Sequence, residues 1–451
     1  MTGTTRRFLL ASMLALATLC AAHAEPAAEL RVATFQCDVT PPIGHWLYAR
    51  PLKTVEHPLL AKGVILEQDA RRYVLCAIDW CVLSGGAHTR MRQTMADAAG
   101  TDLANTAIQC VHVHTAPIID SDAKGLLTGL DDPPAYYDPA FLDRVTGSLS
   151  GAVAKAAEEM VPCDRIGTSQ AKVDRVASNR RIKVDGKVRW RGSSGGRNPA
   201  LAKLPEGTID PAVKTITFAR GDKPIARLHY YATHPQSFYR DARASYDFTG
   251  MAREKLEEEE GVFQVYFTGC SGDVAAGKYN DGTPEARQGL YERMLDGMRA
   301  AAAATEYRPV EPLVWRTADL VLPPKNVPGY NAEKFRKDLH NPKTGAARRI
   351  WAARRVAFYE REKPIAISSL QMGDVYIVHL PGEPMLEFQL FAQKQRPEAF
   401  VAVAGYGDGS TSYICTDQSF KEGAYEPRAA AVGPGSEEIL KGAIRELMGL
   451  E

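Results

Sequence analysis

Apolar positions along this chain follow two patterns, short runs typical of strands and longer segments with helical spacing. Residues 61–68 and 72–83 are apolar runs joined by a charged stretch, which predicts a hairpin whose second strand is buried on both faces. A helical segment at 87–100 and the apolar run AIQCVHVH at 107–114 follow. The order strand, helix, strand predicts a βαβ unit.

The rest of the chain continues this mixture. Helices are predicted over residues 138–160, 249–261, 283–304 and 436–449, the first with Asp138 as its cap and Pro139 in its first turn. Strands are predicted over residues 163–173, 187–192, 212–219, 224–234, 263–269, 312–324, 365–384 and 399–408. Strands in pairs, broken by helices, predict an α/β protein with mixed β-sheets flanked by helices.

Length and composition set the domain organisation. The 451 residues contain no Gly/Ser or Pro linker, no repeat and no low-complexity tract, so we expect one large domain. Residues 323–365 are basic and combine helix with loop, and they resist a clear assignment.

The first 24 residues have the composition of a secretory signal. Arg6 and Arg7 precede a short apolar stretch that ends at Ala22-His23-Ala24, which predicts cleavage after Ala24. The apolar stretch is short for a membrane span, and no later segment is long enough to cross a bilayer. We therefore expect residues 25–451 to be exported to the periplasm or the extracellular space.

Charge and cysteine content argue against two classes, nucleic-acid-binding proteins and proteins held together by a disulfide framework. With 55 basic and 54 acidic side chains the whole chain has a net charge of +1, and loss of the signal with its two arginines changes this to −1. A near-neutral chain with interspersed charges gives no electrostatic case for binding nucleic acid. Seven of the eight cysteines follow the signal, mostly within apolar strands, which does not indicate a disulfide framework.

Polar residues that can bind metal occur where predicted strands end. They are His112 and His114 after one strand, His234 before Pro235, Glu383 before Pro384, and Tyr413 after a glycine-rich bend. In α/β folds, sites are commonly assembled at strand ends. Zinc accepts imidazole nitrogen and carboxylate oxygen, and a catalytic site keeps one position open for water.

Each of these residues also has a simpler interpretation. His112 and His114, two apart on one strand face, could be hydrogen-bonded surface residues, and His234 could be an ordinary buried histidine. Glu383 could be a first-turn acid at a helix N-terminus, and Tyr413 could be an ordinary core or rim aromatic. Ser271, in FTGCSGDVAAG, could be a nucleophile or a turn residue, and the lack of a G-x-S-x-G elbow favours the turn.

The order of the short motifs is more informative than any one of them. CDVTPPIG, HVHTAP, NRR, ATHPQS, GCSGDV, LPGEP and SYICT…AYE occur in the order found in the neutral/alkaline, non-lysosomal ceramidase family, which this chain resembles. The resemblance covers most of residues 33–305 and again 366–428, whereas residues 306–365 match poorly. It implies the catalytic domain only, because the chain ends soon after the motifs and leaves no room for the family's C-terminal immunoglobulin-like domain.

The resemblance implies a role for each motif residue. A Zn²⁺ ion would be bound by His112, His234, Glu383 and Tyr413. His114 would transfer a proton or orient the carbonyl, and Tyr425 would face the substrate carbonyl. Arg180 would line the site, and Ser271 would lie in the family's N-S-G-D turn, where Cys270 replaces asparagine here.

The implied activity is a zinc-dependent amidohydrolase that cleaves the N-acyl amide of ceramide or a related N-acyl lipid, with peripheral contact to a membrane. Pro235-Gln236 replace the family's Gly-Thr beside a ligand, so the lipid specificity does not follow from the metal site. Two alternatives remain open at this point. One is a zinc hydrolase of another exported amide, and the other is a non-catalytic envelope protein that uses the same fold for binding.

Overall fold

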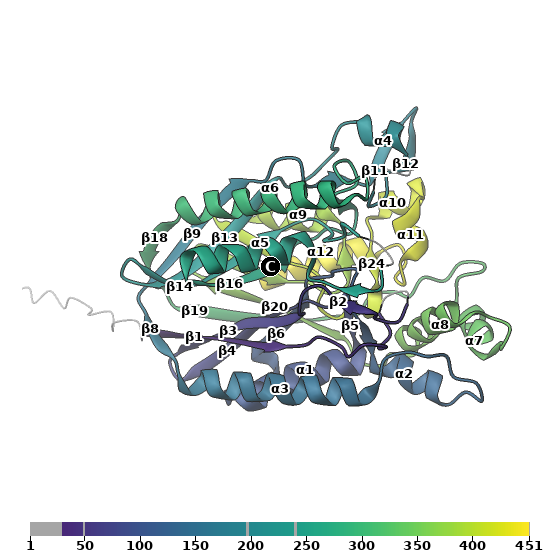
Figure 1. The fold of residues 1–451 in the computed structure, drawn as a ribbon, viewed down its shortest axis with the longest axis horizontal. Helices are drawn as coiled ribbons and strands as arrows, with labels where there is room; N and C mark the ends of the chain where they lie inside the picture. Colours follow the sequence, from purple (N-terminus) through teal and green to yellow (C-terminus); the bar gives the residue numbers. More distant parts are fainter. Residues whose placement is uncertain (1–28, 48–49, 195–197, 239–240, 451) are drawn as a thin grey trace, which may run out of the picture.

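The computed structural model describes residues 29–47, 50–194, 198–238 and 241–450. The predicted signal segment, residues 1–24, lies outside them. The described chain is a mixed α/β protein in which three larger β-sheets, with their helices and several two-stranded sheets, form one large domain (Figure 1). In the described ranges, no helix is long and apolar enough to cross a membrane.

The first sheet has the strand order β6-β4-β3-β1-β8. Its strands are β1 (Leu30–Asp38), β3 (Leu60–Gln68), β4 (Arg71–Ile78), β6 (Thr106–Cys110) and β8 (Val161–Cys163). Helices α1 (Gly85–Ala99) and α3 (Pro139–Glu158) pack side by side on this sheet (Figure 1). The predicted hairpin is β3-β4, and β4 pairs in parallel with β6, which confirms the βαβ unit.

The second sheet has the order β16-β14-β13-β9-β18. It contains β9 (Arg165–Lys172), β13 (Ala212–Arg220), β14 (Lys223–Tyr231), β16 (Phe263–Thr268) and β18 (Glu306–Pro309). Helices α5 (Asp247–Glu260) and α6 (Pro284–Ala303) cover it. One continuous hydrophobic core joins the residues of the first and second sheets.

The third sheet has the order β19-β20-β21-β23. Its strands are β19 (Leu313–Leu320), β20 (Ile365–Met372), β21 (Val375–His379) and β23 (Phe400–Ala404), with α9 (Leu386–Gln395) and α12 (Ser436–Leu447) packed against them. Residues 323–365, which showed no clear pattern in sequence, contain α7 (Ala332–His340) and α8 (Ala346–Tyr359), a helical pair that projects beside α2 (Ser121–Thr128) (Figure 1).

The remaining elements are short. They are β2 (Thr54–Val55), β5 (Val82–Ser84), β7 (Ile118–Asp120), β10 (Ser178–Asn179), β11 (Arg181–Val184), β12 (Lys187–Trp190), α4 (Pro199–Lys203), β15 (Arg243–Ala244), β17 (Val274–Ala275), β22 (Glu383–Pro384), β24 (Tyr413–Ile414), α10 (Asp417–Glu422) and α11 (Tyr425–Ala429), with 3₁₀ turns at Leu103–Asn105 and Gly409–Thr411.

The three sheets repeat one structural unit. Each is a three-stranded antiparallel meander followed by a helix and a fourth strand that pairs in parallel with the third. The units are β1-β3-β4-α1-β6, β9-β13-β14-α5-β16 and β19-β20-β21-α9-β23. In each unit the third and fourth strands are parallel, so their carboxyl ends lie at the same edge of the sheet. Residues that follow these ends in the three units can therefore meet.

Hydrogen bonds join the carboxyl ends of these three fourth strands. The Cys110 amide donates to the Tyr406 carbonyl at 2.8 Å, and the Gly405 amide donates to the Thr268 carbonyl at 2.9 Å. The Thr268 hydroxyl donates to the Val111 carbonyl at 2.7 Å. We call this set of hydrogen bonds the junction of the sheets. It fixes the position of the residues that follow each of the three strands.

Two of the strands that end earlier than predicted lead into His112 and His234. The strand predicted over residues 107–114 ends at Cys110, and His112 has a φ of +69°, so the alternation argument for His112 and His114 is wrong. The strand predicted over residues 224–234 ends at Tyr231, three residues before His234. In both places the chain leaves the sheet to form the junction, and tertiary hydrogen bonds override the local apolar pattern.

Candidate metal centre

Three of the predicted metal ligands meet at the junction of the sheets. His112 follows β6, His234 follows β14 and Glu383 follows β21. The Nε2 atoms of both histidines lie 3.4 Å from Oε2 of Glu383, and the three donor atoms all lie within 4.8 Å of one another. A tetrahedral ion bonded at about 2.0–2.2 Å separates its ligand atoms by roughly 3.3–3.6 Å. The spacing therefore fits a metal ion.

These donor atoms have no other use among the described residues. His112 Nε2, His234 Nε2 and Glu383 Oε2 are buried, and beyond their contacts with one another none has a hydrogen-bond partner in the described ranges. Buried polar atoms are nearly always hydrogen-bonded, so three unpaired ones that converge indicate a missing ligand. The donor set, two imidazoles and one carboxylate, is typical of zinc.

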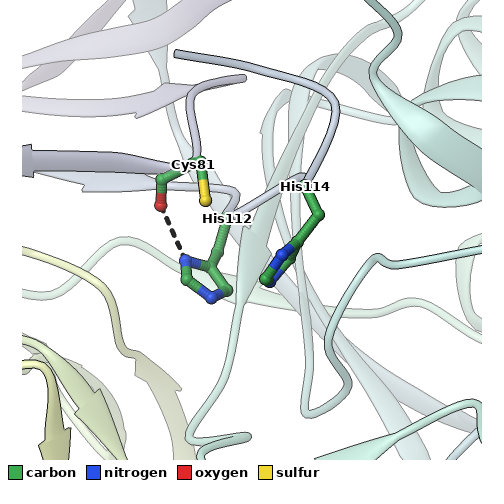
Figure 2. A group of neighbouring side chains, drawn as sticks. All are labelled: Cys81, His112 and His114. Atoms are coloured by element: carbon green, nitrogen blue, oxygen red, sulfur yellow. Dashed lines mark hydrogen bonds between the residues drawn. The ribbon is translucent and has the colours of Figure 1, made fainter. Parts of the chain in front are cut away.

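Main-chain carbonyls fix the orientation of both histidines. His112 Nδ1 lies 2.6 Å from the Cys81 carbonyl, as Figure 2 shows, and His234 Nδ1 lies 2.7 Å from the Ser271 carbonyl. A carbonyl can only accept, so Nδ1 carries the proton in each ring and Nε2 presents its lone pair. Histidine ligands of metals are held in the same way.

Electrostatics favour the ligand form of the donors. Burial and the charge of Arg180 lower the pKa of His234 to about 4, so this imidazole is neutral at pH 7. Burial would raise the pKa of the Glu383 carboxyl, but its close contacts with the His112 and His234 rings outweigh burial and hold that pKa well below its usual range. A neutral imidazole and an ionised carboxylate are the forms that bind metal.

Tyr413 lies next to this set. It pairs with Glu383 in the short parallel bridge β22-β24, and its hydroxyl lies 3.3 Å from Nη2 of Arg180. The same Nη2 contacts the Gly272 carbonyl and lies 3.2 Å from Oε1 of the fully buried Glu426. Tyr413 and Arg180, which the sequence analysis assigned to one site with Glu383, are therefore neighbours in the structure. The Tyr413 hydroxyl is directed to Arg180.

Tyr425 forms an aromatic wall that runs from this site toward the surface. Its ring meets Tyr413 edge-on at 5.7 Å between centroids and stacks on Trp190 at 5.0 Å. Trp190, from β12, is 38% exposed. The Arg180 guanidinium lies 5.8 Å from the Tyr425 ring centroid, so the two side chains are direct neighbours.

His114 lies beside the rings of His112 and His234. The His112 and His114 rings are perpendicular at 4.8 Å between centroids, and the His114 and His234 rings are 5.7 Å apart. Burial, together with the closeness of the His112 and His234 rings, lowers the pKa of His114 well below its ordinary value. His114 is therefore a neutral imidazole beside the donors.

Ser271 follows β16 and takes part in the site mainly through its backbone. Its carbonyl accepts from His234, and its hydroxyl is hydrogen-bonded to Tyr406 at 2.6 Å. The next residue must be glycine, because a Cβ on Gly272 would lie 2.5 Å from the Glu383 carbonyl oxygen. This geometry favours the turn interpretation of the serine.

Tyr406 is a residue of the site that the sequence did not reveal. It follows β23 with a φ of +64°, and its ring stacks on that of His112 at 4.3 Å between centroids. Its hydroxyl also lies 3.5 Å from Nδ1 of His234. The only signal in the sequence is its place at a strand end between two glycines, in AGYGD.

The fold and the three converged donors define the class, a large mixed α/β protein with a candidate metal centre at the ends of its strands. No family model and no curated protein matches the chain in sequence. Among solved structures, a neutral ceramidase from Pseudomonas aeruginosa matches with a TM-score of 0.70 and 14% identity, over 94% of this chain and 75% of that one. A ceramidase complexed with C2 matches with a TM-score of 0.67 and 14% identity, over 94% and 76%.

These similarities confirm the resemblance at the level of the fold. The chain has the fold of neutral ceramidase, as the order of its motifs implied. An identity of 14% shows the fold alone, so the chemistry has to be argued from the side chains.

Proposed function

We propose that this protein is a zinc-dependent amidohydrolase of the neutral ceramidase type, which cleaves the N-acyl amide of ceramide or a related lipid. The observation that supports it most is the convergence of His112, His234 and Glu383, whose buried donor atoms lack other partners in the described ranges. The chain has the fold of solved neutral ceramidases, which favours hydrolysis of an N-acyl amide over other zinc-dependent reactions.

In this proposal the zinc ligands are His112, His234 and Glu383, with Tyr413 as the fourth. A zinc ion there would lower the pKa of bound water toward neutrality and polarise an amide carbonyl. The backbone carbonyls of Cys81 and Ser271 keep both imidazoles in the correct tautomer. The protein thus supplies the ligands in the protonation state that zinc requires.

The other side chains of the site act on the substrate. Arg180 is buried, and its Nε has no hydrogen-bond partner among the described residues, so it can donate to the oxygen that becomes negative. Tyr425 lies beside Arg180 and faces the same substrate group in this proposal. His114, a neutral imidazole, can accept a proton and pass it to the leaving amine.

The substrate and location follow from the same proposal. The aromatic wall of Tyr413, Tyr425 and Trp190 offers apolar surface beside the donors, which suits an acyl chain or sphingoid base. A lipid substrate requires peripheral contact with a membrane or micelle. We also propose that the protein is exported with a cleaved signal, so that the N-terminus of the mature protein, determined by mass spectrometry, is Glu25.

Hydrolysis assays test the proposal. The purified protein, incubated with a panel of N-acyl sphingosines and N-acyl amino acids, should release fatty acid from the former, and a chelator should stop the reaction. His112→Ala and Glu383→Ala should lose zinc and turnover. His229→Gln, which changes a buried histidine bonded to Thr215 and Gln264, is the control and should keep both.

Each other result has a defined meaning. Turnover that survives a chelator and both ligand substitutions would overturn the proposal. Zinc binding with activity only on N-acyl amino acids would favour the other hydrolase. A protein without zinc and without turnover would be a binding protein on this fold.

A further inference from the structure

A second set of metal-binding side chains shares His112 with the first. Cys81, His112 and His114 are all buried, and one donor atom from each lies within 4.8 Å of the other two. Figure 2 shows the Cys81 sulfur and the His114 ring beside the His112 ring. Among the described residues, no other cysteine belongs to such a group.

The spacing of this set suits a metal ion after a small adjustment. Bonds of about 2.0–2.1 Å to nitrogen and about 2.3 Å to sulfur separate tetrahedral ligands by roughly 3.3–3.8 Å. Rotation of the Cys81 side chain about its Cα–Cβ bond, with rotation of the His114 side chain, can close the remaining distance. The backbone can stay in place, because the His112 amide donates to the Trp80 carbonyl at 3.0 Å and the Trp80 indole donates to the Val39 carbonyl at 3.0 Å.

The donors of the two sets differ in chemical softness. The first set offers a carboxylate, whereas the second replaces it with sulfur, and thiolate ligands select soft, thiophilic ions. We propose that Cys81, His112 and His114 form a second cation site, selective for thiophilic divalent ions such as Cd²⁺ or excess Zn²⁺, and that its occupation inhibits the enzyme. When the ion binds, an Sγ–metal bond replaces the Sγ–H bond and the proton passes to solvent, with no change of oxidation state.

The inhibition follows from the roles of His112 and His114 in the proposed reaction. An ion in the second site engages His114, the proposed proton carrier, and competes for His112, a proposed ligand of the catalytic ion. This part rests on the proposed function, whereas the binding of the ion does not.

A spectroscopic titration separates the two parts. Cd²⁺ is added to the zinc-loaded full chain, and the ultraviolet charge-transfer band of a cadmium–thiolate bond is followed. The band should appear in the wild-type protein and in Cys76→Ala, a buried cysteine of β4 outside the set, and should be lost in Cys81→Ala. The Cd²⁺ concentration that halves hydrolysis of an N-acyl sphingosine should rise at least tenfold in Cys81→Ala only.

The outcomes are distinct. A band that persists in Cys81→Ala, or that is absent from the wild type, overturns the site. A band that behaves as expected with an unchanged sensitivity to Cd²⁺ overturns the inhibition. If no variant hydrolyses the substrate, the proposed function fails but the band still decides the site. Should Cys81→Ala not fold, cadmium NMR of the wild type must show one sulfur and two nitrogen ligands, and any other ligand set contradicts the inference.

Discussion

His112 and Tyr406 both adopt a left-handed backbone conformation, with φ of +69° and +64°. A non-glycine residue in this region carries strain of about 1–3 kcal/mol, which persists only where the surroundings impose it. Here the two rings stack at 4.3 Å, and the His112 amide is hydrogen-bonded to Trp80. With this backbone conformation the His112 Nε2 atom lies 3.4 Å from Oε2 of Glu383.

The Tyr406 hydroxyl provides a test at this scale. Tyr406→Phe keeps the ring that stacks on His112 but leaves the buried Ser271 hydroxyl without its partner, which should lower the free energy of unfolding by about 1–3 kcal/mol. Because Ser271 orients His234, zinc affinity should fall as well. Urea unfolding and competition with a zinc chelator measure the two effects.

Tyr266→Phe is the matched control for this substitution. Its hydroxyl is also buried and donates to the Tyr231 carbonyl, within the second sheet. It should lower stability without changing zinc affinity. Equal zinc affinity in the wild type and both variants would contradict the role of Tyr406.

Donor side chains at the ends of apolar strands made His112, His234 and Glu383 candidates, and the resemblance to the neutral ceramidase family implied that they are ligands. The sequence did not reveal Tyr406, because a tyrosine beside glycines is typical of an ordinary core or rim aromatic, and a positive φ at a non-glycine residue has no pattern in sequence. Cys81 was hidden in the same way, within an apolar run that predicted only a buried strand.

At the scale of elements, most strands and helices follow from hydrophobic periodicity, but their threefold arrangement does not. The three meander–helix–strand units share hydrogen-bond topology, and the chain shows no repeated sequence. Residues 323–365 were equally hard to assign from sequence. Their buried cations donate hydrogen bonds to main-chain carbonyls, and such partners cannot be recognised from residue types. Arg355 of α8 donates to the Ala429 carbonyl at 2.7 Å and to the Ser412 hydroxyl at 2.9 Å.

Lys325 belongs to the same contacts and predicts a pH dependence. Its Nζ donates to the Pro427 and Arg428 carbonyls, at the end of the helix that begins with Tyr425. Burial and the charge of Arg355 lower its pKa from 10.5 to about 7. Between these values the unfolded chain holds a proton that the folded protein has released, so the contribution of Lys325 to stability rises with pH.

The comparison with Lys325→Met isolates this effect. The free energy of unfolding of the wild type minus that of Lys325→Met should increase from pH 7 to pH 10 and stay level below pH 7, as measured by urea titrations. Lys187→Met, which replaces an exposed lysine, should show no such trend. A difference that is flat or falls above pH 7 would contradict the lowered pKa.

At the scale of the whole molecule, a buried ion pair links two of the three units. Asp79 follows β4 of the first sheet, and Arg253 lies on α5, which covers the second. Both guanidinium Nη atoms lie 2.9 Å from the Asp79 carboxylate, and each side chain is only 1% exposed. Asp79 directly precedes Trp80 and Cys81, whose carbonyls hold His112, so this pair connects the packing of the units to the site.

Removing one partner of this pair should be costly. Arg253→Met leaves the Asp79 carboxylate buried without its cation and should lower the free energy of unfolding by about 3–5 kcal/mol. The double variant Asp79→Leu/Arg253→Met should recover part of that loss. A denaturant-unfolding cycle of the four proteins measures the coupling, and a single substitution that costs less than about 1 kcal/mol would contradict it.

The sequence predicted the fold class and a single large domain, and the solved ceramidases confirm the fold. How three sheets meet at one junction depends on backbone hydrogen bonds and on pairs such as Asp79 and Arg253, which are far apart in sequence. Such contacts leave no local pattern in the sequence. The arrangement of the three sheets could therefore be expected only from the resemblance of the ordered motifs to the ceramidase family.

The central claim is that His112, His234 and Glu383 bind one zinc ion. A crystal of the zinc-loaded protein, measured on both sides of the zinc absorption edge, should show its strongest anomalous peak within about 2.0–2.2 Å of His112 Nε2, His234 Nε2 and a Glu383 carboxylate oxygen. Crystals that contain zinc but show no peak between these three residues would contradict the account.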